Sequence, residues 1–163
     1  MAKAAPSSYE SIIRDVDARQ FKPIYFVYGD ETYYIDSISK YFEDNILTDD
    51  EKEFNFSIMY GKDITASNIV DEARQFPMFS DYRLVIVKEA QNIDNWDILS
   101  FYLEHPSDKS VILICYRSDK VDARRKIFKD ITAKGVMFQS KRLYDNQVAP
   151  WIIDYVSRAG YKV

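Results

Sequence analysis

The sequence predicts an α/β protein of three layers, in which helices cover both faces of a parallel sheet of about five strands. Short apolar runs alternate five times with longer segments whose apolar residues recur every three or four positions. Two of the runs, RLVIVKEA from Arg83 and SVILICY from Ser110, are typical of strands that are covered on both faces. Regular alternation of strand and helix favours parallel pairing, with the helices as crossovers.

The elements follow from this alternation and from turn and cap signals. In the first half we expect a short amphipathic helix within residues 8–21, a strand at 23–29, a helix at 30–47, an acidic loop at 48–54, a strand at 55–61 and a helix that Asp63 or Thr65 caps and that runs through Ala73. In the second half we expect a strand at 83–90, a helix at 92–106, a strand at 110–116, a helix at 122–135 with Gly135 as its C-cap, a strand at 136–143 and a helix at 148–160.

The domain organisation expected from these elements has three parts. Residues 1–20 form an N-terminal helix packed on the core, residues 21–143 form the α/β domain, and residues 144–163 begin another helical unit. The last helix has an apolar face with nothing obvious left to pack on, so the chain resembles the front part of a longer protein.

Composition limits the function. The net charge of −4 argues against a general nucleic-acid binder, which usually carries a basic face. A single cysteine, Cys115, excludes an internal disulfide framework and a cysteine-based zinc site, and its apolar setting predicts a buried structural thiol. The single histidine, His105, stands at a helix end, so a catalytic triad has little material. No apolar run is long enough to span a membrane, and we expect a cytoplasmic protein.

The stretch FVYGDETYYID lies where a nucleotide-binding α/β protein would carry its phosphate loop. The pattern GxxxxGK[ST] is absent, and Gly29 is followed by Asp30 and Glu31, which suit the positive end of a helix but repel phosphate. At the end of RLVIVKEA, Lys88 and Glu89 stand where an aspartate would be needed for Mg²⁺. We therefore expect no ATP hydrolysis, no cofactor and no metal.

The connection QFPMFSDYR, from Gln75 to Arg83, is unusual because helix–strand connections are normally polar. Its first part is apolar: Phe76, Pro77, Met78 and Phe79. Pro77 ends the helix at Phe76 and would push the next two side chains outward. One interpretation is a hydrophobic plug that folds back on the sheet. The other is a protein-binding anchor, worth roughly 3–6 kcal/mol before the costs of association.

A basic segment, DARRKIFKDITAK, stands out in this acidic chain. It contains Arg124, Arg125, Lys126, Lys129 and Lys134. A solvated helix face is one interpretation, and a contact with DNA phosphates or with a neighbouring subunit is the other.

Three stretches together resemble the delta subunit of the bacterial DNA polymerase III clamp loader: PIYFVYGDETYYID, RQFPMFSDYRLVIVKEAQ and LICYRSDKVDARRKIFKDI. The resemblance covers nearly the whole chain. It implies a P-loop NTPase fold of the AAA+ type with a degenerate phosphate loop, followed by a helical lid and a collar. It also implies a non-catalytic subunit of a DNA polymerase holoenzyme, working with delta-prime and gamma or tau subunits and meeting DNA through the complex.

The resemblance further implies a site. Delta subunits grip the ring-shaped sliding clamp, beta, with an apolar pair at the corner between the second helix and the third strand, and help to open the ring. Carried over, the pair is Met78 and Phe79, with Phe76 and Pro77 shaping the corner. Family members often have Leu-Phe there, so Met78 is a conservative departure. The lid would begin around Lys141, and we expect the collar to lie outside this sequence. A scaffold domain for another partner and an unorthodox nucleotide-binding enzyme are the competing hypotheses.

Overall fold

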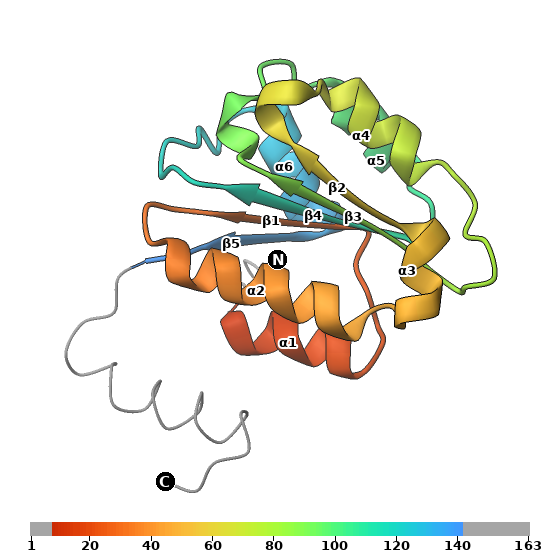
Figure 1. Cartoon of the computed structure of the whole chain (residues 1–163). Coiled ribbons are helices and arrows are strands. Elements are labelled where there is room, and N and C mark those ends of the chain that lie inside the picture. The colour runs from red at the N-terminus through yellow and green to blue at the C-terminus, as the bar shows by residue number, and fades with distance from the viewer. Residues whose placement is uncertain (1–7, 142–163) are drawn as a thin grey trace, which may run out of the picture.

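Five strands form one parallel sheet in the computed structural model, which describes residues 8–141 (Figure 1). The strands are β1 (Ile24–Tyr28), β2 (Phe56–Tyr60), β3 (Arg83–Lys88), β4 (Ser110–Tyr116) and β5 (Val136–Gln139). Their order across the sheet is β2-β3-β4-β1-β5, and every neighbouring pair is parallel. The predicted parallel sheet is thus confirmed.

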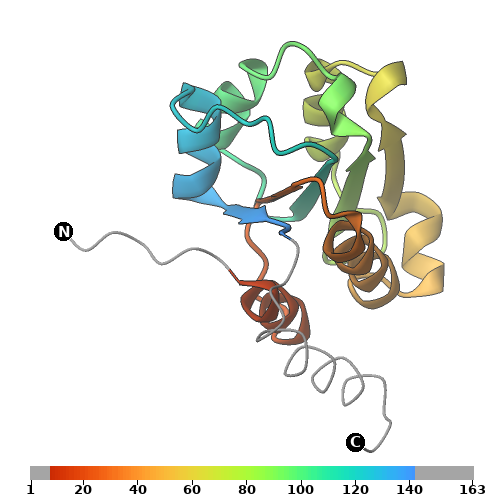
Figure 2. The same cartoon turned by 90° about the vertical axis from the view of Figure 1, so that its left-hand side faces the viewer.

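Helices cover both faces of this sheet (Figure 2). Helices α1 (Tyr9–Asp17) and α2 (Thr32–Asn45) lie on one face, and helices α4 (Ala66–Ala73), α5 (Ile98–Glu104) and α6 (Lys126–Lys134) lie on the other. Alternate residues of a strand serve the two layers: Tyr25 and Val27 pack with α1 and α2, whereas Phe26 packs with α5 and α6. This alternation explains why the central strands are apolar throughout.

The predicted acidic loop at 48–54 is wrong, because the segment forms helix α3 (Asp49–Asn55). Thr48 caps the helix with its side chain and Glu51 bonds back to the Thr48 backbone, so that both halves of a capping box are present. Three acidic residues in the first turn also suit the positive end of the helix. The S/T-x-x-E signature was readable in the sequence, and the high charge concealed it.

Several predicted boundaries also shift. Helix α6 begins at Lys126 rather than at residue 122, and α5 spans Ile98–Glu104 rather than residues 92–106. Two short 3-10 turns, η1 (Gly61–Asp63) and η2 (Ala90–Asn92), follow β2 and β3. Helix α4 ends at Ala73, well before Pro77, so the proline does not set its end. Thr65, not Asp63, is its N-cap, and Gly135 is the C-cap of α6 as predicted.

The N-terminal helix α1 buries Ile12, Ile13 and Val16. The helix predicted at 148–160, and with it the expected lid, lies outside the described residues. The division of the chain at residues 20 and 143 stays a prediction. None of the helices within residues 8–141 is long and apolar enough to cross a membrane.

Candidate functional site

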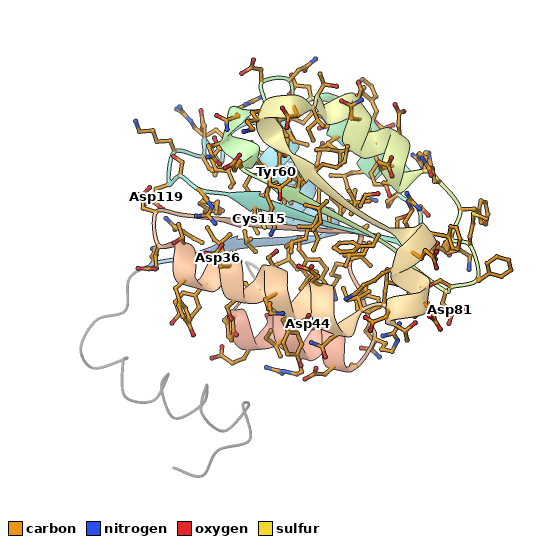
Figure 3. The ribbon with its side chains drawn as sticks, viewed as in Figure 1. Asp36, Asp44, Tyr60, Asp81, Cys115 and Asp119 are labelled. Carbon is orange, nitrogen blue, oxygen red and sulfur yellow. The ribbon has the colours of Figure 1, made fainter. Side chains whose placement is uncertain are left out.

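The two regions singled out by the sequence lie at opposite edges of the sheet. The corner, residues 75–82, joins α4 to the start of β3 and so lies at the amino-terminal edge. The turn at Gly29 follows β1 and lies at the carboxyl-terminal edge. In Figure 3, Asp81 of the corner and Asp119, which follows β4, mark the two ends of the molecule.

The apolar side chains of the corner are exposed. The exposed fraction is 79% for Phe76, 52% for Met78 and 91% for Phe79, while Pro77 is half-buried. The interpretation of a plug that folds back on the sheet is therefore wrong. Large apolar side chains gathered in one exposed loop mark an interaction surface rather than part of the core.

The backbone of the corner is held by a buried side chain from α3. Asn55 is fully buried, and its Nδ2 donates to the Met78 carbonyl at 2.7 Å while its Oδ1 accepts from the Met78 N–H at 2.6 Å. The same Nδ2 donates to the Glu51 carbonyl at 2.8 Å. The amide thus pairs with both polar groups of Met78, as a neighbouring strand would, and fixes the corner against α3.

A second tie runs through Arg83, the first residue of β3, which is buried. Its guanidinium donates to the Glu72 carboxylate at 2.5 Å, to the Glu72 carbonyl at 2.9 Å and to the Phe54 carbonyl at 3.0 Å. One planar group therefore joins the C-terminal part of α4 to that of α3 beneath the corner. These bonds and the neighbouring Ser57 hydroxyl hold the pKa of Glu72 below its usual value.

Two further features show that the corner has a defined shape. Phe79 adopts a left-handed backbone conformation with φ of 58°, which is uncommon for a bulky residue and costs roughly 1–2 kcal/mol. Glu51 of α3 accepts hydrogen bonds from the Thr48 backbone and the Ser80 side chain, and these lower its pKa. The corner is thus a fixed loop whose apolar side chains stay in solvent.

The carboxyl-terminal edge shows the reverse arrangement. Gly29 has φ of 143°, and a Cβ atom added to it would lie 2.2 Å from the carbonyl oxygen of Ser140. Ser140, just after β5, donates from its N–H to the Tyr28 carbonyl at 2.6 Å and from its hydroxyl to the Glu31 carbonyl at 2.5 Å. The single glycine of the turn is needed for this close approach of two backbone segments.

Three backbone N–H groups at this turn and at the start of α2 already have protein acceptors. The Gly29 N–H donates to the Tyr116 carbonyl at 3.1 Å, the Asp30 N–H to Asp119 Oδ1 at 3.3 Å and the Tyr33 N–H to Glu31 Oε1 at 3.0 Å. Two of these three acceptors are carboxylate oxygens, which would repel an incoming phosphate. Of the two acids expected to cap α2, only Glu31 does so.

Asp30 instead faces Asp119. The hydrogen bond from the Asp30 carboxyl to Asp119, together with the negative charge of Asp119, raises the pKa of Asp30. The same hydrogen bond lowers the pKa of Asp119. The edge therefore holds two exposed carboxyl groups, whereas a phosphate site needs positive charge.

The predicted basic segment is largely paired with acids. Arg124 contacts Asp122 at 3.0 Å, Arg125 contacts Asp97 at 3.3 Å and Lys126 contacts Asp130 at 2.6 Å. Both arginines precede α6 rather than lying on it, and Lys129 is exposed on the helix. A contact with DNA or another subunit would have to compete with these ion pairs.

Cys115 and His105 lie where the sequence predicts. Cys115 is buried, and the loss of solvation raises the pKa of its thiol to about 12. His105 is exposed and ends α5. Among the described residues, no group of three or more His, Cys, Asp or Glu side chains is placed to hold a metal ion.

Comparison with known proteins now adds to this geometry. The family model described as DNA polymerase III, delta subunit, matches residues 25–141. The chain belongs to this family. A curated relative, DNA polymerase III subunit delta of Bacillus subtilis, is 24% identical over 142 residues, covering 81% of this chain and 41% of the relative. The chain thus spans less than half the length of this relative.

Solved structures agree on the fold. The DNA clamp loader delta protein of Bacillus subtilis superposes with a TM-score of 0.81 at 21% identity, over 93% of this chain and 48% of that one. A gamma subunit-related protein of DNA polymerase III from Thermotoga maritima gives a TM-score of 0.56 at 13% identity, over 91% of this chain and 50% of its own. The fold class expected from the sequence is confirmed by these neighbours.

Sequence reasoning missed three residues that shape the two regions. Asn55 was assigned to a strand, although Asn is uncommon in strands and often makes side-chain hydrogen bonds to the backbone. Phe54 was placed in an acidic loop, and Ser140 was given no role. Each acts through a contact with a residue at least 23 positions away, such as the Asn55–Met78 pair, which no local pattern reveals.

Proposed function

We propose that this chain is the clamp-binding part of a clamp-loader delta subunit. Its corner would bind the sliding clamp, beta, through Phe76, Pro77, Met78 and Phe79, and help to open the ring for loading onto DNA during replication. The observation that carries the proposal is a rigid loop with three highly exposed apolar side chains. Rigid presentation favours binding because little conformational freedom is lost on association.

The mechanism that fits this surface is preferential binding. An anchor that holds an opened or strained clamp more tightly than the closed clamp shifts the equilibrium towards opening by the difference in binding free energy. Nothing catalytic is needed on this chain. The energy for the cycle would come from ATP on gamma or tau subunits, with delta-prime completing the loader, and the complex would work in the cytoplasm.

We also propose that the chain itself binds no ATP. The turn at Gly29 has Ser140 packed against it, the N–H groups of Gly29 and Asp30 have protein acceptors, and Asp30 and Asp119 add negative charge. Mg-ATP at millimolar concentration should therefore leave the midpoint of thermal unfolding unchanged, because a ligand stabilises a protein only by binding its folded state. A rise of several degrees would support the competing hypothesis of an unorthodox nucleotide-binding enzyme.

A clamp titration tests the main proposal. The chain and a Met78→Ala/Phe79→Ala variant are titrated against the sliding clamp of the same organism. Both side chains are exposed, so the free energy of unfolding should change by less than about 1 kcal/mol. Binding should weaken at least about a hundredfold, because two large apolar contacts are lost. Equal binding of both proteins would remove the corner from the site and favour a scaffold for another partner.

The basic segment carries a weaker second proposal. Lys129 lies on α6 beside Arg124, Arg125 and Lys126, which are all at the surface. If this segment contacts DNA phosphates within the loader, a Lys129→Ala/Arg124→Ala variant should lower the salt dependence of DNA binding by the assembled complex. An unchanged salt dependence would leave a solvated surface with local ion pairs.

A further inference from the structure

One more exposed aromatic residue lies beside the corner. Phe54, near the end of α3, has 53% of its surface exposed. Its neighbour Asn55 makes both hydrogen bonds to the Met78 backbone, and the Phe54 carbonyl accepts from Arg83 at 3.0 Å. The backbone of Phe54 is therefore joined to the same hydrogen-bonded unit as the corner.

The corner alone is too small for a specific interface. A stable interface buries about 800 Å² on each partner and involves about 20–30 residues on each side, whereas the corner has eight residues at 75–82. A partner that covers Met78 and Phe79 must therefore rest on neighbouring surface as well. The α3 side of the corner offers an exposed aromatic residue that is joined to Met78 by hydrogen bonds.

The surroundings of Phe54 are acidic. Asp50 lies one helical turn before Phe54, Glu53 precedes it directly, and Asp81 lies at the far end of the corner; all three are exposed. The one lysine of α3, Lys52, is 3.9 Å from Asp49. Polar rims of interfaces are arranged so that the charges of the two partners are complementary.

We propose that Phe54 is a second apolar contact for the protein that binds the corner, and that this protein presents an apolar pocket bordered by lysine or arginine side chains. This inference rests on the proposed function and extends its surface from the corner onto α3. Phe54 supplies apolar area at the edge of the pocket, while Asp50, Glu53 and Asp81 face the basic border.

The test compares single variants of the 163-residue chain in a titration against the sliding clamp. Phe54→Ala should weaken binding about five- to fiftyfold, as expected when an aromatic contact is lost from an interface. Tyr60→Ala is the matched control, because Tyr60 is 44% exposed and lies at the other end of β2, away from α3 (Figure 3). It should bind as the parent does. Phe79→Ala reports on the corner itself, and denaturant unfolding confirms that each variant folds.

A second pair of measurements tests the charged rim. An Asp50→Asn/Glu53→Gln variant should associate about two- to tenfold more slowly at low salt and show a weaker dependence on salt, with little change in the dissociation rate. Both side chains are exposed, so the fold should be unaffected. Association that is as fast and as salt-dependent as the parent's would overturn the basic border.

The outcomes separate the inference from the proposed function. If Phe79→Ala loses binding and Phe54→Ala binds as tightly as the parent, the corner is the site and the inference about α3 is wrong. If Phe79→Ala also binds like the parent, or the parent does not bind the clamp at all, the proposed function fails and the inference fails with it. Loss with both variants and not with Tyr60→Ala supports the extended surface.

Discussion

The two edges of the sheet differ in what they leave for other molecules. At the carboxyl-terminal edge, where α/β proteins of this type bind ligands, the N–H groups of Gly29 and Asp30 already have protein acceptors, and Ser140 packs against Gly29. At the amino-terminal edge, the corner has its backbone bonded to Asn55 and its apolar side chains in solvent. The usual ligand edge is closed, and the opposite edge is open.

This difference shows that a region's position in the fold does not by itself decide what it can bind. N–H groups that already have acceptors within the chain gain little free energy from a phosphate, whatever their position in the fold. A region that keeps three large apolar side chains exposed gains free energy when any matching surface covers them. Position in the fold alone would have pointed to the carboxyl-terminal edge, whereas the exposed apolar side chains of the corner lie at the amino-terminal edge.

The sharpest test of the comparison changes one residue at each edge. A methyl group is added at Gly29, and the aromatic ring is removed at Phe79. Gly29→Ala should destabilise the protein by at least about 3 kcal/mol, because the new Cβ meets the Ser140 carbonyl oxygen and φ stays in the region that favours glycine. Phe79→Ala removes a much larger group but should cost less than about 1 kcal/mol, because the side chain is exposed. Urea unfolding of both variants measures the contrast. Similar losses for the two would mean that the Gly29 turn is open.

Removing the hydrogen bonds that Asn55 makes beneath the corner is expected to have the next largest effect on stability. Asn55→Ala removes three hydrogen bonds and leaves both polar groups of Met78 unpaired, so unfolding should become easier by about 2–3 kcal/mol. Clamp binding should also weaken, because the corner loses its defined geometry. Asn45→Ala is the control: its Nδ2 makes one exposed bond, to the Tyr41 carbonyl, and the expected cost is below about 0.5 kcal/mol. Equal losses of unfolding free energy in the two variants would show that the hydrogen bonds of Asn55 contribute no more than a surface contact.

A smaller effect separates stability from binding at one residue. Phe79→Asn places a residue that tolerates the left-handed region at φ of 58°, so stability should stay the same or rise by up to about 1 kcal/mol. Clamp binding should fall at least about tenfold, because the aromatic ring is lost. Thermal unfolding and a clamp titration give the two numbers. A variant that loses stability and binding together would indicate that the Phe79 ring supports the fold of the corner.

Sequence patterns were sufficient for the fold and for one of the two regions. The apolar runs of β3 and β4 and the 3–4 spacing along α2 follow from local chemistry, so the parallel sheet was predictable. The apolar corner could also be recognised from the sequence, because Phe-Pro-Met-Phe is unusual in a helix–strand connection. Its exposure was not predictable, since a plug and an anchor have the same sequence.

What the sequence did not reveal depends on contacts between distant segments. Asn55 reads as a weak strand residue until Met78 lies beside it, and Ser140 reads as the end of a strand until it packs on Gly29. The ion pairs of Arg124 with Asp122 and of Lys126 with Asp130 could have been predicted, because the partners are two and four residues apart. The ion pair of Arg125 with Asp97 joins distant segments and could not be predicted from the sequence.

The smallest expected effect is a pH dependence confined to the closed edge. The raised pKa of Asp30 means that its contribution to stability is complete at low pH and is lost as pH rises through that pKa. The lowered pKa of Asp119 has the opposite sign, so its contribution is lost as pH falls through that value. At a pH between the two pKa values, Asp30 is protonated and donates to the Asp119 carboxylate. Above the raised pKa of Asp30, both groups are charged and repel each other.

Asp119→Asn keeps an acceptor for the Asp30 N–H and removes one charge. It should therefore gain stability relative to the parent as pH rises through the raised pKa of Asp30. Chemical unfolding at several pH values measures this difference. A stability difference between variant and parent that does not change with pH would mean that Asp119 does not raise the pKa of Asp30.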